Sequence, residues 1–212
     1  MQVGADEAGK GPVLGPMVAA AVRAPADAIP SGVDDSKRLA PARRRELAER
    51  LRESDATTVA VAVITPARID APETDMNGLT VAAQAEAIAD VAAAGDAVVV
   101  DAGDVNADRF GRRVDDGVAT DVTVTAEHRA DENHPHVAAA SVVAKVERDA
   151  RIEALTERYG DVGSGYPSDE RTRDFLARYV RDNGELPACA RASWSTCADV
   201  LDAAAQSSLA DF

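Results

Sequence analysis

Four carboxylates stand beside apolar segments of this sequence, at Asp6, Glu7, Asp101 and Asp131. An acid that ends a purely aliphatic run, as Asp101 ends AVVV, is expected to be partly desolvated, and a buried carboxylate needs a compensating partner, often a metal ion. No Cys/His cluster accompanies these acids, which favours a hard cation, magnesium or manganese, over zinc. Neighbours on a regular strand point to opposite faces, so Asp6 and Glu7 can share one site only if the strand ends or bulges there.

The same stretch is close to a phosphate-binding loop. Residues 4–11 read GADEAGKG, against the pattern GxxxxGK[ST]. Gly11 stands where a Ser or Thr hydroxyl would hold magnesium, and the two acids inside the loop would repel a triphosphate unless metals intervened. A nucleoside triphosphatase is therefore the weaker alternative to a metal-dependent acidic site.

The histidines offer a second possible metal pair. His134 and His136 flank Pro135, but no third ligand lies at a useful spacing, so loop histidines without a metal are the favoured interpretation. His128 and His134 remain candidates to tune or gate the acidic site beside Asp131.

Apolar periodicity predicts the elements that must position these side chains. Strands are expected over residues 1–6, 16–23, 57–64, 97–100 and 121–126, and helices over 40–54, 77–95, 137–159, 170–182 and 192–206. Strands first, then strands alternating with helices, indicate a layered α/β domain with a mixed sheet.

Charge and composition limit the classes of function that this sequence could have. The 212 residues carry 37 acids against 23 basic residues, a net charge of −14, which by itself argues against a nucleic-acid binder. Metal ions held by the acids would reverse that inference at the active face, because they present positive charge to phosphate. Only three basic residues are Lys, and an acidic, Lys-poor, Ala-rich chain suits a salt-rich cytoplasm, where salt screens the repulsion.

The remaining signals predict a soluble cytoplasmic protein. No apolar run reaches the length of a membrane span, and the N-terminus lacks the pattern of a secretory signal. Cys189 and Cys197 are too few for a disulfide framework, so reduced structural cysteines are expected.

Five blocks in order carry a resemblance to a known family: GADEAGKGPVLGPMVAAA, DDSKRL, VVVDAGDVN, EHRADENHPHVAAASVVAKVERD and YGDVGSGYPSD. Together they resemble ribonuclease HII in its archaeal form. The resemblance implies an α/β, ribonuclease H-like fold with a mixed central sheet flanked by helices and a C-terminal helical extension. It also implies a catalytic domain over residues 1–187, a C-terminal helix over 188–205 packed on or beside it, and a tail over 206–212.

The resemblance further implies an endoribonuclease. Such an enzyme hydrolyses the RNA strand of RNA–DNA hybrids and cuts at ribonucleotides embedded in duplex DNA, leaving 5′-phosphate and 3′-hydroxyl ends. The four family acids fall on Asp6, Glu7, Asp101 and Asp131, as catalytic residues and as ligands of two Mg²⁺ or Mn²⁺ ions, with Asp6 as the candidate shared ligand.

Substrate contacts are implied at Gly9, Lys10, Gly11, Ser36, Lys37, Ser141, Lys145 and Tyr166. The glycines let the backbone approach the sugar and sense its 2′-hydroxyl, and the tyrosine is expected to stack on the sugar at the RNA–DNA junction. Lys10 stands where the family has Arg, which keeps the charge but loses the bidentate fork.

The C-terminus resembles a peptide that docks replication sliding clamps, through Gln206, Leu209 and Phe212; the alternative is a frayed tail. The family expectation is a monomer.

Two further alternatives for the function stay open. Ribonuclease HIII usually carries an N-terminal substrate-binding domain, whereas this chain begins at the first catalytic strand. A non-catalytic hybrid-binding module would gain nothing from four carboxylates facing phosphate.

Overall fold

The structure, a computed structural model, describes residues 1–33 and 39–210, with only the helical backbone over 207–210. The chain divides into two compact units that interleave along the sequence. The first comprises residues 1–8, 17–63 and 75–148, and the second comprises residues 9–16, 64–74 and 149–212. The continuous domain predicted over 1–187 stays a prediction.

A five-stranded sheet forms the first unit in the order β3-β2-β1-β4-β5. Its strands are β1 (Gln2–Ala8), β2 (Met17–Ala24), β3 (Thr58–Ile64), β4 (Ala97–Asp101) and β5 (Thr123–Glu127). Strand β1 pairs antiparallel with β2 and parallel with β4, which in turn pairs parallel with β5. The mixed sheet of an α/β fold is therefore confirmed.

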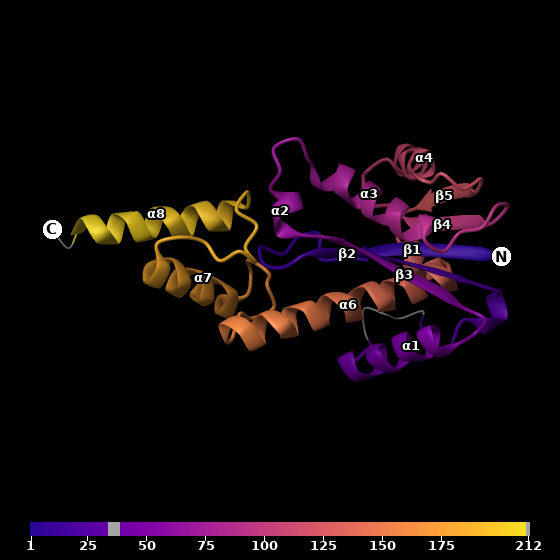
Figure 1. Cartoon of the computed structure of the whole chain (residues 1–212), viewed down its shortest axis with the longest axis horizontal. Helices are drawn as coiled ribbons and strands as arrows, with labels where there is room; N and C mark the ends of the chain where they lie inside the picture. The colour runs from indigo at the N-terminus through magenta and orange to yellow at the C-terminus, as the bar shows by residue number, and fades with distance from the viewer. Residues whose placement is uncertain (34–38, 211–212) are drawn as a thin grey trace. The chain divides into compact units, whose positions relative to one another are not determined.

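Helices cover both faces of this sheet (Figure 1). Helices α3 (Met76–Ala89) and α4 (Ala107–Gly117) lie on one face, and α1 (Pro41–Glu53) and the first part of α6 (Pro135–Tyr159) lie on the other. Short turns of helix occur at η1 (Ala26–Ala28) and α5 (Ala130–Asn133). Asp75 begins α3 by accepting the backbone N–H groups of Asn77 and Gly78, which satisfies donors that the helix itself leaves without a partner.

Helix α6 packs very closely on β1. A Cβ atom on Gly4 would lie 2.2 Å from the backbone carbonyl carbon of His136, so no larger residue fits there without displacing the helix. The Ala- and Val-rich first half of α6 continues this contact into a core shared with β2 and α1. Because Asp6 follows Gly4 by two residues, its side chain faces α6 as well.

The second unit is built around helices. It contains α2 (Pro66–Ile69), the last part of α6, α7 (Glu170–Asn183) and α8 (Ser195–Ala210). Its core includes Leu14, Phe175 and Leu176, and the rings of Tyr159, Phe175 and Tyr179 pack against one another with centroids 5.9–6.0 Å apart. Both cysteines are free and buried in this unit, in accord with the expected reduced, structural role.

Several predicted boundaries differ from the structure. Helix α4 was not predicted, because its sequence ADRFGRRVDDG is mostly polar; Asn106, which caps it by accepting the Arg109 N–H, was the available signal. The last helix begins at Ser195 rather than at residue 192. Residues 190–194 therefore follow an irregular path.

No helix in the described ranges has both the length and the apolar character that a bilayer crossing requires.

Candidate active site

Asp6 is a buried carboxylate, with 5% of its surface exposed. The Ser141 hydroxyl hydrogen-bonds to it, and the Lys145 ammonium attracts it and donates to Ser141. Ser141 and Lys145 lie one helical turn apart on α6, so both face this part of β1. Burial, with a smaller contribution from the Asp101 charge, raises the pKa of Asp6 to about 7 against the lowering effects of Lys145 and Ser141.

Asp101 lies at the end of β4, on the same face as Asp6. The β1–β4 register pairs Ala5 with Val100, so the residues that follow each of them point to the same side of the sheet. The Oδ1 atom of Asp101 accepts the backbone N–H of Ala130 at 2.9 Å. The carboxyl end of β4 is thereby joined to the start of α5.

Asp131 is the next residue after Ala130 and is also buried, with 5% exposed. The chain turns from β5 into α5 at Arg129, whose backbone has a φ of 59°. That left-handed conformation is uncommon for a residue with a side chain, so local packing must maintain it. The turn brings Asp131 to the sheet edge at which Asp101 ends β4.

Glu7 points to the opposite face. Of the two conditions set by the sequence, a bulge is absent, because β1 stays in regular register with β2 through Ala8. The strand does end directly after Glu7, at Ala8, and its pairing with β4 extends only from Gln2 to Ala5. The Glu7 carboxylate accepts the side-chain amide of Gln84 on α3 at 2.6 Å. The sharing of one site by Glu7 and Asp6 stays a prediction.

Gln84 is a site residue that the sequence analysis missed. Its amide nitrogen also donates to the backbone carbonyl of Asp101 at 3.0 Å, so one buried side chain ties Glu7 to the end of β4. Within the described part of the chain its Oε1 atom has no hydrogen-bond partner. The available signal was a polar amide inside the apolar stretch VAAQAEA.

The carboxylates fit a hard divalent cation through their chemistry. They supply only oxygen donors, and Asp6 is held in a place where burial disfavours its charged form. Among residues 1–33 and 39–210, however, no three His, Cys, Asp or Glu side chains are grouped to hold an ion. Magnesium is typically bound through one or two carboxylates together with water and substrate phosphates, so such a donor set is sufficient.

Gly9, Lys10, Gly11 and Tyr166 belong to the second unit. Gly9 has a φ of 88°, a conformation that favours glycine. The Tyr166 ring lies 3.9 Å from the position that a Cβ atom on Gly11 would take, and 41% of its surface is exposed. The structure thus brings the predicted glycine loop and the predicted stacking tyrosine side by side.

The other predicted residues are placed as follows. Ser36, Lys37 and Phe212 lie outside the described residues, as does the side chain of Leu209. Helix α8 runs through Ala210, so the exposed Gln206 lies on a helix.

The histidines occupy separate environments. His134 contacts Glu127 with 2.9 Å between Nε2 and Oε2, and the buried His136 contacts the carbonyl of Ala24. Burial lowers the pKa of His136, which favours a neutral structural histidine.

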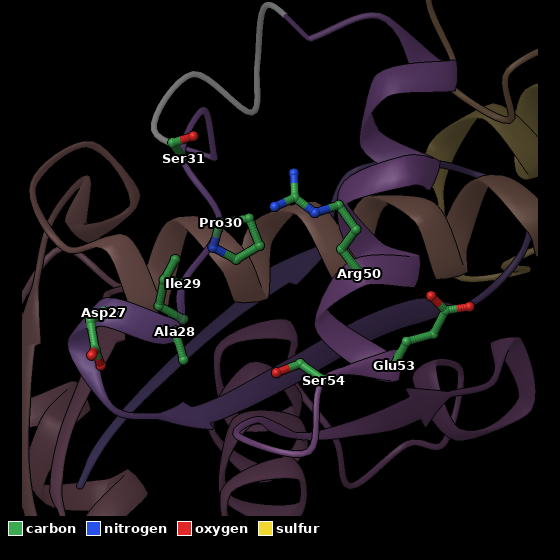
Figure 2. A pocket seen from close by; sticks show the side chains of 8 residues that line it. All are labelled: Asp27, Ala28, Ile29, Pro30, Ser31, Arg50, Glu53 and Ser54. Atoms are coloured by element: carbon green, nitrogen blue, oxygen red, sulfur yellow. The ribbon is translucent and has the colours of Figure 1, made fainter.

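A hollow of about 600 Å³ lies elsewhere on the first unit (Figure 2). It is lined by Asp27, Ala28, Ile29, Pro30, Ser31, Arg50, Glu53 and Ser54. The lining includes none of the four site acids and none of the residues predicted to contact substrate.

A mixed five-stranded sheet, with the buried Asp6 near the end of β1 and the half-buried Asp101 at the end of β4, defines the class: an α/β enzyme with the ribonuclease H-like fold. The sequence model of one family, described as Ribonuclease HII, matches residues 3–197. The chain belongs to the ribonuclease HII family, and it is accordingly a ribonuclease.

Full-length relatives and solved structures agree with this assignment. A ribonuclease HII of Haloarcula marismortui, a halophilic archaeon, is 63% identical over 212 residues and all of both chains. The ribonuclease H2 of Pyrococcus horikoshii has a TM-score of 0.89 at 36% identity, covering 96% of this chain and 98% of that one. The PCNA:RNase HII complex of Archaeoglobus fulgidus gives a TM-score of 0.83 at 39% identity, with 94% and 96% covered.

The ribonuclease HIII alternative matches less well. The structure of Bst-RNase HIII in complex with Mn²⁺ has a TM-score of 0.76 at 26% identity, and the match covers 97% of this chain but 70% of that one. The family model and the full-length relatives therefore favour ribonuclease HII.

Proposed function

We propose that this ribonuclease hydrolyses the RNA strand of RNA–DNA hybrids and cuts at ribonucleotides embedded in duplex DNA. The products carry 5′-phosphate and 3′-hydroxyl ends. One observation carries the proposal: burial and the charge of nearby Asp101 raise the pKa of Asp6, so a cation bound there would stabilise its charged form. Membership of the ribonuclease HII family supports the same activity.

Asp6, Glu7, Asp101 and Asp131 would hold two Mg²⁺ or Mn²⁺ ions. When bound, such a pair supplies a nucleophilic water of lowered pKa and neutralises charge on the leaving oxygen. The Mn²⁺ in the related Bst-RNase HIII structure supports this choice of ion.

The chain's own groups orient these ligands. Ser141 and Lys145 hold Asp6 from α6, and the Ala130 N–H fixes one oxygen of Asp101. Gln84 holds Glu7 from α3. Phosphate contacts by Ser141 and Lys145 stay part of the proposal beside these contacts with Asp6.

The rest of the proposal concerns partners. Gly9, Lys10, Gly11 and Tyr166 contact the ribonucleotide, and Ser36 and Lys37 contact phosphate. The C-terminal residues Gln206, Leu209 and Phe212 bind the replication sliding clamp, which the PCNA complex of the Archaeoglobus fulgidus relative supports. A monomer in the cytoplasm remains the expectation.

The test uses a labelled duplex with one ribonucleotide. Wild-type protein should cut it with Mg²⁺ or Mn²⁺ and not with EDTA, and the product end should be extendable by a polymerase, as a 3′-hydroxyl is. Asp101→Asn should lower the rate by at least about 10²–10³-fold, the size of losing one group that stabilises transition-state charge.

Asp108→Asn is the matched control, because Asp108 is an exposed acid on α4 and the substitution makes the same charge change. It should cut at the wild-type rate. Wild-type cutting by Asp101→Asn would refute the site, and ATP turnover without strand cutting would favour the triphosphatase alternative.

A further inference from the structure

Arg191 is completely buried in the second unit, which is rare for an arginine. Its guanidinium donates to three backbone carbonyls of one loop. Nη2 lies 2.6 Å from the Gly9 oxygen, Nη1 lies 3.0 Å from the Lys10 oxygen and Nε lies 2.9 Å from the Gly15 oxygen. One cation thus holds two consecutive carbonyls of the predicted substrate loop.

Trp194 completes this arrangement. Its indole N–H donates to the carbonyl of Gly11 at 3.3 Å, and its ring lies under the Arg191 guanidinium at 5.1 Å. The carbonyls of residues 9, 10 and 11 therefore all have donors from one short segment. This is a dedicated support for the loop, because an arginine and a tryptophan three residues apart serve three successive peptide groups.

The orientation of those carbonyls determines the orientation of the amides. In a planar trans peptide, the N–H of the next residue points away from the carbonyl oxygen. With the Gly9 and Lys10 oxygens turned toward Arg191, the N–H groups of Lys10 and Gly11 point to the opposite side. Consecutive amides aimed in one direction form a concavity that binds anions or hydroxyl oxygens.

The segment that carries Arg191 and Trp194 is itself held firmly. Asp70 accepts the backbone N–H groups of Ala192 and Ser193 at 2.8 and 3.0 Å, and the Ser193 hydroxyl at 2.5 Å. The Arg191 N–H donates to the Val13 carbonyl at 2.8 Å. These contacts explain why helix α8 begins only at Ser195.

We propose that Arg191, assisted by Trp194, is a positioning residue for ribonucleotide recognition. It acts through the Gly9–Gly11 carbonyls and so aims the amides of Lys10 and Gly11 at the 2′-hydroxyl of the ribonucleotide. The inference rests on the proposed function, and it adds to it a residue that determines the preference for ribonucleotide over deoxyribonucleotide.

The experiment measures that preference directly. Two labelled duplexes are used, identical except for one ribonucleotide, and dissociation constants are taken from fluorescence anisotropy in EDTA, where no cutting occurs. Wild-type protein should bind the ribonucleotide duplex more tightly. Arg191→Lys keeps the charge but cannot span three carbonyls, and it should reduce the preference by about 5–30-fold, the size of one or two lost hydrogen bonds.

Two further variants separate positioning from folding. Trp194→Phe keeps a ring beside Arg191 and removes only the donor to Gly11, so it should reduce the preference by a smaller factor. Phe175→Leu weakens the core of the same unit and leaves the Arg191 and Trp194 donors in place. It should lower the melting temperature and leave the preference at the wild-type value.

The outcomes are distinct. A wild-type protein that binds both duplexes equally in EDTA overturns the inference, whereas the proposed function is refuted only if the ribonucleotide duplex is not cut with Mg²⁺ or Mn²⁺. A wild-type preference that survives in Arg191→Lys shows that Arg191 is only structural and overturns the inference. If Arg191→Lys does not fold, Trp194→Phe decides in the same way: an unchanged preference overturns the inference, and a reduced one supports it.

Discussion

At the scale of single residues, the site is built at the expense of stability. Asp6 is kept where its charge is poorly solvated, and Lys145 and Ser141 offset this only in part, since the pKa of Asp6 remains near 7. A group at a functional site often opposes folding in this way. The penalty should be measurable in the metal-free protein.

Asp6→Asn should therefore stabilise the metal-free protein, and more so at high pH. The folded-state pKa of Asp6 is about 7, above the ordinary value of 3.8, so the folded wild type binds an extra proton between these values and loses stability as pH rises from about 4 to 7. Asn does not titrate. The melting temperature of Asp6→Asn relative to wild type, in EDTA, should be higher at pH 8 than at pH 5.

The difference between the folded and unfolded pKa of Asp6 limits the size of this change in stability. Each pKa unit corresponds to about 1.4 kcal/mol, and each kcal/mol to about 2–4 °C for a chain of this length. Asp108→Asn, on the exposed surface, should show no such pH trend. An equal difference at pH 5 and pH 8 would mean that Asp6 is not held in its protonated form.

The sequence predicted Asp6, Glu7 and Asp101 because they end apolar runs, and Asp131 because it precedes a helix and matches a block of the family pattern. Gln84 and Arg191 were not predicted. Each acts through groups that only folding brings near: Gln84 lies 77 residues from Glu7, and Arg191 lies 182 residues from Gly9. A lone Gln or Arg in a sequence carries no sign of the carbonyl or carboxylate it will meet.

At the scale of elements, Asp96 joins the start of β4 to β2 and to the N-terminus. Its carboxylate lies 2.6 Å from Arg23 Nε and 3.0 Å from the Met1 amine, and it accepts the Ala93 N–H. The Arg23 guanidinium is the largest cause that holds the pKa of Asp96 well below its usual range, and the Ala93 and Met1 bonds add to it. This buried acid stabilises the centre of the sheet.

Asp96→Asn should destabilise the protein by about 1–3 kcal/mol at pH 7, less than a fully buried pair, because Arg23 and the amine keep access to water. The depressed pKa stabilises the fold above the unfolded value of 3.8, and this contribution is lost as pH falls below it. Melting curves should therefore show a gap between wild type and variant at pH 7 that narrows toward pH 3. A constant gap would assign the loss to packing instead.

The elements themselves were predicted unevenly. The five strands and the long helices follow from apolar periodicity, since their buried faces must be apolar. Helix α4 was missed because most of its residues are polar, and only three of them, including Phe110 and Val114, are buried. Asp6 and Glu7 lie in a regular strand because β2 pairs with it through Ala8, a contact that the local sequence does not specify.

At the scale of the whole molecule, the net charge of −14 must be accommodated. The Debye length is about 10 Å at 0.1 M salt and about 3 Å at 1 M, so repulsion between separated surface acids is large at low salt and screened at high salt. A relative from a halophilic archaeon is 63% identical over the full length of this chain. In the proposed function the site acids have a different role, because cations bound there would offer positive charge to phosphate.

The melting temperature should therefore rise from 0.1 M to about 2 M KCl, and cutting should persist at molar salt, where an ordinary nuclease loses affinity for DNA steeply. Asp115→Asn combined with Asp116→Asn removes two exposed acids on α4 and should reduce the gain in melting temperature. Maximal stability and activity near about 0.05 M would refute salt adaptation and leave the nuclease assignment intact.

The sequence by itself determined the family, the α/β class and the net acidic charge, and it proposed the acids of the site, because these depend on residue type and local order. Tertiary structure decided which acids share a face, which residues hold them and what supports the glycine loop. The physical reason is that burial and hydrogen-bond partners arise from contacts between distant segments. The pKa of Asp6 is raised because the packing of α6 on β1 buries its carboxyl group.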